Sequence, residues 1–126
     1  MSKILVVGTG PLYSPEIKVF CGQSLRTWHI ADALRTAGHK VDLFVIQTDG
    51  HAPTEDVADK VAYARYDGFE YGIIHSWAPE KVLPILQEVH DSADYDCIVG
   101  INVNAAAIVA RVRTRLPMWC DLMGHM

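Results

Sequence analysis

Short apolar runs that alternate with helical stretches constrain the fold of this chain more than any other feature. Ile4 to Val7 is a continuous apolar run, as in a strand that is buried on both faces of a sheet. Apolar side chains then recur with helical spacing over residues 24–37, just before Gly38, a residue type that commonly follows a helix. Strands that alternate with helices form parallel sheets through right-handed crossovers. We therefore expect a Rossmann-like α/β domain, a three-layer αβα sandwich with a parallel sheet of about five strands in the order 3-2-1-4-5.

Further runs of the same two kinds divide the rest of the chain. Helices are expected over residues 24–37, 79–90 and about 102–116, and Pro84 must kink the second or mark its first turn. Residues 71–75 belong either to a loop or to a brief strand. Trp119 follows the pattern of the last strand and is expected in the core. The expected strands cover residues 3–8, 40–47, 60–66, 95–101 and 117–120.

Composition limits the classes of function that this chain can have. The length of 126 residues suits one domain, and half of the residues are apolar, which is enough for a core. The formal net charge of −4 gives no electrostatic case for binding nucleic acid. No apolar run approaches the ~20 residues that span a bilayer, and the first residues do not resemble a signal peptide, so we expect a cytoplasmic protein without a transmembrane segment.

Metal and disulfide chemistry also lack a sequence pattern. The cysteines are widely spaced and form no CxxC pair, and no two histidines stand as HxH or HxxxH. We therefore expect neither a metal site nor a disulfide framework. The cysteines are Cys21, Cys97 and Cys120.

Polar residues concentrate in the loops that follow the expected strands. Ligands of open α/β sheets bind beyond the carboxyl ends of the strands. Gly22 stands just before the first helix, where a bare backbone lets a ligand approach the helix N-terminus, although it could also be only a turn glycine. By position, the candidate binding residues are Gly8, Thr9, Gly10, Gly22, Asn102 and Asn104.

Asp121 and His125 are the candidate catalytic residues. Both follow the last expected strand, and a carboxylate and an imidazole in one loop could contact ligand hydroxyls or transfer a proton. A structural role for this loop is the alternative. Arg111, Arg113 and Arg115 are instead expected at the end of a helix, where cations favour the helix dipole, rather than in a phosphate site.

Several nucleotide-binding and signalling motifs are absent. Gly8-Thr9-Gly10 begins like the dinucleotide fingerprint G-x-G-x-x-G, but Tyr13 takes the last position and the expected acidic residue downstream is missing. No Walker A sequence occurs. A receiver domain needs an acidic pair after its first strand, where this chain has glycines and a threonine. A receiver-like signalling domain and a non-catalytic α/β interaction domain remain as alternatives.

Three phrases of the sequence together resemble GT-B glycosyltransferases of the retaining, nucleotide-sugar type, over nearly the whole chain. The first is the opening strand, the long loop to Gly22 and a helix that ends in Ala33-Leu-Arg-Thr-Ala-Gly-His-Lys-Val41. The second is Tyr95-Asp-Cys-Ile-Val-Gly-Ile-Asn-Val-Asn104. The third is Pro117-Met-Trp-Cys-Asp-Leu-Met-Gly-His125.

The resemblance implies an enzyme of two Rossmann-like domains, in which the first binds the acceptor and the second binds the donor nucleotide. Residues 1–126 would then be an incomplete N-terminal domain, inactive without the C-terminal one. The early glycine loop would approach the donor phosphates and the acceptor, and Asp121 or His125 would contact the transferred sugar. The resemblance implies no metal or other cofactor. Because the last strand runs into the end of the chain, we also expect a homo-oligomer that covers this edge.

Overall fold

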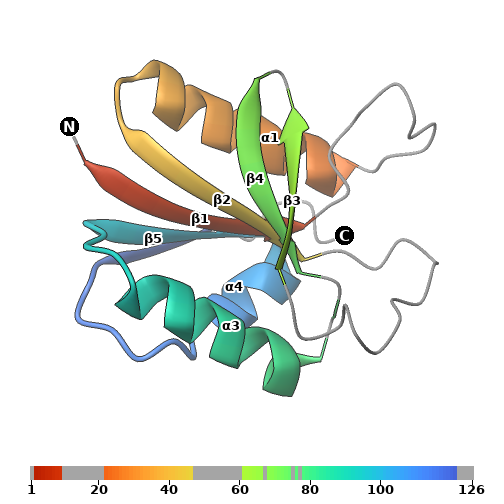
Figure 1. Cartoon of the computed structure of the whole chain (residues 1–126), viewed down its shortest axis with the longest axis vertical. Coiled ribbons are helices and arrows are strands. Elements are labelled where there is room, and N and C mark those ends of the chain that lie inside the picture. Colours follow the sequence, from red (N-terminus) through yellow and green to blue (C-terminus); the bar gives the residue numbers. More distant parts are fainter. Residues whose placement is uncertain are drawn as a thin grey trace.

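The computed structural model describes residues 2–9, 22–46, 61–66, 68–74, 76 and 78–121. Within this part of the chain, one sheet lies between α1 on one face and α3 and α4 on the other (Figure 1). The helices are α1 (Gly22–Thr36), α3 (Pro79–Asp91) and α4 (Val103–Val109). The strands are β1 (Lys3–Thr9), β2 (Lys40–Ile46), β3 (Val61–Tyr66), β4 (Phe69–Ile74), β5 (Cys97–Ile101) and β6 (Met118–Asp121).

The described strands form a six-stranded, mostly parallel sheet in the order β3-β4-β2-β1-β5-β6. The central strand β1 pairs in parallel with β2 and with β5. β2 pairs in parallel with β4, and β5 with β6, so that only β3 runs antiparallel to its neighbour. The expected α/β class with helices on both faces is therefore confirmed, whereas the expected number and order of strands are wrong.

The error lies in the third strand. Residues 60–66 were expected beside β2, but β3 is an edge strand that pairs antiparallel with β4, from Val61 opposite Ile74 to Tyr66 opposite Phe69. β4 takes the place beside β2. Gly68, between the two strands, has a φ of +76°, which glycine adopts without steric cost. The order 3-2-1-4-5 holds only when β4 counts as the third strand and β3 as an addition at the edge.

Two apolar cores fill the two faces of the sheet. Neighbouring residues of a strand point to opposite faces, so Leu5 and Val7 belong to one core and Ile4 and Val6 to the other. The first core also contains buried residues of α3 and α4, whereas the second contains Ala31 of α1. α1 and α3 thus fall close to their expected ranges because each buries a stripe of apolar side chains at helical spacing.

Two glycines allow helices to lie unusually close to the sheet. A Cβ atom at Gly8 would stand 2.3 Å from Cγ2 and 2.6 Å from Oγ1 of Thr27 in α1. A Cβ atom at Gly100 would stand 2.9 Å from Cα of Ala106 in α4. All three distances are shorter than the contacts that Cβ atoms make in proteins. Gly8, a candidate binding residue, therefore has a packing role between β1 and α1.

The third helix is shorter than expected. α4 ends at Val109, and residues 110–116, which were expected to continue it, are not helical. Gln87 of α3 donates from Nε2 to the carbonyl oxygen of Arg113 (3.1 Å) and accepts the N–H of Arg113 at Oε1 (2.8 Å). These two hydrogen bonds engage the Arg113 backbone with α3 instead of with a helical turn. The three arginines expected in the last helical turn consequently lie beyond the helix.

Trp119 was expected in the core, but 59% of its surface is exposed. It pairs with Val99 across β5 and β6, which places its side chain on the sheet face that α1 covers. α1 packs mainly on β1, β2 and β5, and on this face of β6 Arg26 of α1 bonds to the buried Asp121 while Trp119 stays exposed. The strand pattern predicted burial of Trp119 because it could not show that α1 leaves this residue uncovered.

Candidate functional site

The direction in which successive strands are added to the sheet changes between β1 and β5. From β1 the chain continues to β2 on one side, and it later returns through α3 to β5 on the other side. In open α/β sheets, ligands bind outside the carboxyl ends of the strands at such a switch in direction. β1 ends at Thr9, and Asn102 follows the last residue of β5. These two residues therefore mark the candidate site.

An ion pair between β6 and α1 forms one side of this edge. Asp121 is the last residue of β6 and only 6% exposed, and its Oδ2 accepts a hydrogen bond from Nε of Arg26 in α1. This hydrogen bond to Asp121 raises the pKa of Arg26, whose guanidinium stays charged. Asp121 was expected in a loop, but it is a buried strand residue with a fixed partner. That arrangement suits orienting a cation better than it suits proton transfer.

Thr9 closes β1 beneath α1. Its backbone N–H donates to Oγ1 of Thr27 (3.2 Å), and both threonines are buried. The hydroxyl oxygen of Thr9 is buried as well, and no hydrogen-bond partner for it lies within the described residues. A buried hydroxyl without a partner costs about 1–3 kcal/mol. Thr9 is therefore a position at which a bound molecule could supply the missing hydrogen bond.

Asn102 connects β5 to α4 through a strained backbone. Its φ of +73° and ψ of 157° lie in a region that residues other than glycine rarely adopt. The conformation is fixed from two directions, because Asn102 N–H donates to the carbonyl of Asp121 (2.7 Å) and its carbonyl accepts from Ala106 N–H (2.9 Å). Asn102 occupies the N-cap position of α4 but makes no side-chain capping bond there. Strain of this kind is concentrated at functional sites in proteins.

The structure brings part of the predicted site together. Thr9, Asn102 and Asp121 meet at the carboxyl edge of the sheet, and the backbones of the last two are hydrogen-bonded. Gly22 begins α1, and Asn104 is exposed in the first turn of α4. Gly10 and His125 lie outside the described residues.

Sequence reasoning missed Arg26. The available signal was a cation four residues after Gly22, in the first two turns of the helix that follows the glycine loop. Its partner Asp121 lies 95 residues away, so no local pattern linked the two.

The described residues hold neither a cluster of metal ligands nor a helix that could span a membrane. No three histidine, cysteine or acidic side chains gather as a potential metal site among them. None of their helices has the length and hydropathy that crossing a bilayer requires.

Comparison of the chain with protein-family models gives no match, and comparison with curated proteins gives none either. A functional proposal for this chain therefore rests on its sequence pattern and on the geometry of the carboxyl edge.

Proposed function

We propose that this chain is the acceptor-side, Rossmann-like domain of a retaining GT-B glycosyltransferase that uses a nucleotide-sugar donor. The observation that carries the proposal is that Thr9, Asn102 and Asp121 lie together at the carboxyl edge of the sheet, where the strand order changes direction between β1 and β5. These residues come from the opening strand and from the later phrases that resemble the family. The resemblance implies a site that contains residues from all three of these sequence segments.

Arg26 adds a chemical reason for this proposal. Its Nε–H is engaged by Asp121, and its side chain remains 43% exposed. Among the described residues, Asp121 is the one ion-pair partner recorded for this guanidinium, whose terminal N–H groups could bind the oxygens of a diphosphate. Transfer of a sugar from a nucleotide donor leaves a diphosphate, whose developing charge must be stabilised. We assign that role to Arg26, with Asp121 as its positioning residue.

The remaining roles follow from the resemblance. His125 is the candidate contact to the transferred sugar, and Gly8, Thr9, Gly10 and Gly22 form the loop and helix start nearest the donor phosphates. A second domain would bind the nucleotide. The chain alone should therefore bind a nucleotide sugar only weakly and should transfer no sugar.

The test compares binding and turnover. Inorganic pyrophosphate, titrated into the isolated chain and followed by backbone NMR shifts, should perturb α1 near Arg26, and Arg26→Gln should abolish this effect. Lys40→Gln serves as the control, because Lys40 is an exposed cation at the opposite end of the sheet. In the two-domain enzyme, Asp121→Asn and His125→Ala should lower kcat. Wild-type rates for both variants would remove these residues from the site, and sugar transfer by residues 1–126 alone would overturn the two-domain assignment.

One observation favours the alternative of a non-catalytic α/β interaction domain. Trp119 is exposed on the edge strand β6, and an exposed aromatic residue on a sheet edge suits contact with a partner chain. Under this alternative, pyrophosphate would not perturb the carboxyl edge, and self-association would depend on Trp119. A receiver-like domain would instead need acidic residues where β1 ends, and Thr9 occupies that position.

A further inference from the structure

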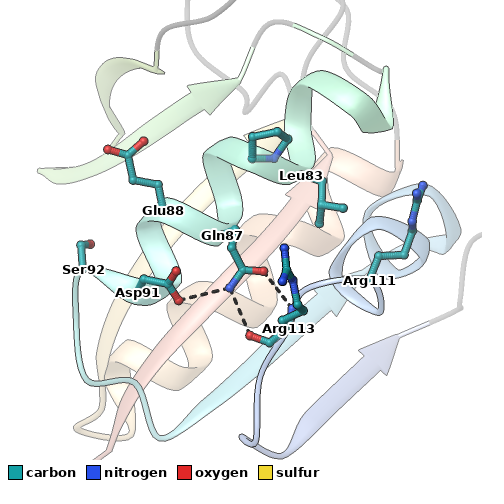
Figure 2. A pocket seen from close by; sticks show the side chains of 8 residues that line it. Leu83, Gln87, Glu88, Asp91, Ser92, Arg111 and Arg113 are labelled. Carbon is teal, nitrogen blue, oxygen red and sulfur yellow. Dashed lines mark hydrogen bonds between the residues drawn. The ribbon is translucent and has the colours of Figure 1, made fainter.

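A groove of about 670 Å³ lies between α3 and the segment 110–116, away from the carboxyl edge of the sheet (Figure 2). Leu83, Pro84 and Gln87 of α3 form one wall, and Arg111 and Arg113 form the other. Figure 2 shows the Arg113 side chain beside Gln87 and Leu83 and the Arg111 side chain farther from α3. Glu88 and Ser92 line the groove on the side of α3 away from the arginines, and Asp91 lines it next to Gln87.

The wall that carries the arginines is not helical, yet it is anchored at several points. Gln87 holds both backbone groups of Arg113, at 3.1 and 2.8 Å. His90 Nε2 lies 2.8 Å from the hydroxyl of Thr114, which also accepts the N–H of Leu116 (3.0 Å). A segment that is fixed in this way presents its side chains with little further loss of conformational entropy on binding.

The guanidinium groups of Arg111 and Arg113 form no ion pair with an acidic side chain among the described residues. The positive charge of Arg113 contributes to lowering the pKa of Asp91. The Oδ1 atom of Asp91 is hydrogen-bonded to Nδ1 of His90 (2.7 Å) and to Nε2 of Gln87 (3.1 Å). These hydrogen bonds, led by the one from His90, hold the pKa of Asp91 below its ordinary value. Asp91 thus has two hydrogen bonds that do not involve the arginines, and each exposed guanidinium retains donors for an external anion.

We propose that this groove binds a phosphate monoester that carries an apolar or aromatic group. A phosphate dianion matches the two positive charges of Arg111 and Arg113, and each guanidinium can bind phosphate oxygens with two parallel N–H groups. The uncharged part of the ligand lies on Leu83 and Pro84 at the same end of the groove. The site is independent of the glycosyltransferase proposal, because it uses none of the residues at the carboxyl edge.

The experiment titrates phenyl phosphate into the whole chain at constant ionic strength and follows backbone amide shifts by NMR. The amides of Leu83, Gln87 and Arg113 should move together. Arg111→Gln and Arg113→Gln should each weaken binding by about tenfold, equal to about 1.4 kcal/mol. Arg115→Gln is the matched control: it removes the same charge from an exposed arginine of the same segment that does not line the groove, and binding should stay within about twofold.

Three further probes separate the parts of the proposal. Inorganic phosphate and benzyl alcohol each carry only half of the ligand, and benzoate carries a single charge, so all three should bind more weakly than phenyl phosphate. Arg26→Gln should leave phenyl phosphate binding unchanged, which distinguishes the groove from the carboxyl edge. An equal loss of affinity in Arg111→Gln and Arg115→Gln would show a general charge effect and overturn the proposal. So would equal affinities for phenyl phosphate and benzyl alcohol, or an absence of amide shifts in the groove.

Discussion

Replacing Gly8 with alanine tests how closely α1 must lie against β1. The added Cβ atom would stand 2.3 Å from Cγ2, 2.6 Å from Oγ1 and 3.0 Å from Cβ of Thr27. Relief requires Thr27 to change its rotamer or α1 to move outward, which also threatens the hydrogen bond from Thr9 N–H to Thr27 Oγ1 (3.2 Å). Because Thr27 is fully buried, neither movement finds free space.

The magnitude follows from two opposing effects. Overpacking of a core typically costs about 1–3 kcal/mol, and the threatened hydrogen bond adds about 1 kcal/mol. Against this, alanine restricts the unfolded chain more than glycine does, which offsets about 0.4–1 kcal/mol. We therefore expect Gly8→Ala to lower the free energy of unfolding by about 1–3 kcal/mol, equivalent to a fall in Tm of roughly 4–12 °C for a domain of this size.

A double-mutant cycle with Thr27→Ala identifies the clash. Thr27→Ala alone should destabilise the fold, because it removes the acceptor of the buried Thr9 N–H. It also removes the two closest atoms and leaves only Cβ at 3.0 Å. Gly8→Ala/Thr27→Ala should therefore lose less stability than the sum of the single variants, with a coupling of about 1–2 kcal/mol. Urea unfolding followed by circular dichroism measures each corner of the cycle as a midpoint shift at constant slope.

Gly100→Ala supplies the matched control. The Cβ atom that alanine adds at this position would stand 2.9 Å from the Cα atom of Ala106, and no substitution can remove a Cα atom. Ala106→Gly should consequently fail to rescue Gly100→Ala, whereas Thr27→Ala rescues Gly8→Ala. Strict additivity in the Gly8 cycle would refute the reasoning, because it would mean that Thr27 does not limit the approach of α1.

Two other predictions concern pH and self-association. Burial is the main cause that raises the pKa of Tyr95 above the ordinary value of about 10, and the hydrogen bond to Asp42 (2.7 Å) adds to it. The free energy of unfolding should therefore keep its full value below about pH 10. It should fall at higher pH, because the unfolded chain then loses the Tyr95 proton while the folded chain keeps it. Tyr95→Phe should flatten this decline in urea unfolding between about pH 9 and pH 11, and an unchanged slope would contradict the assignment. If a second copy of the chain covers Trp119 on β6, light scattering at high protein concentration should show a dimer or larger species. Trp119→Lys should then shift the equilibrium toward the monomer. A monomer at all concentrations would contradict this expectation.

The sequence predicted the strands and helices whose burial follows from the pattern of apolar residues within the element itself. β1 and β2 were found because they are apolar runs buried on both faces, and α1 was found because its apolar side chains recur at helical spacing. The hairpin of β3 and β4 was missed although its signal was present: Asp67-Gly68 separates two strand-like runs by two residues, which is typical of a tight hairpin turn.

Other features depend on contacts between distant residues. The end of α4 is set with help from Gln87, which bonds to the Arg113 backbone 26 residues away. The exposure of Trp119 depends on how far α1 extends across the sheet. Of the candidate site, position in the fold predicted Thr9, Asn102 and Asp121, but the partner of Asp121 could be found only once α1 and β6 were placed side by side.

The central position of β1 also has a consequence for how this protein folds during synthesis. Among the described elements only α1 lies between β1 and β2, so these strands can pair as soon as β2 has emerged from the ribosome. The other side of β1 must wait for β5, whose residues 97–101 are made much later. Until then one row of N–H and C=O groups along an apolar strand has no partner. Such an edge attracts other chains, so the interval between the two pairings is when a chaperone would protect the nascent protein most.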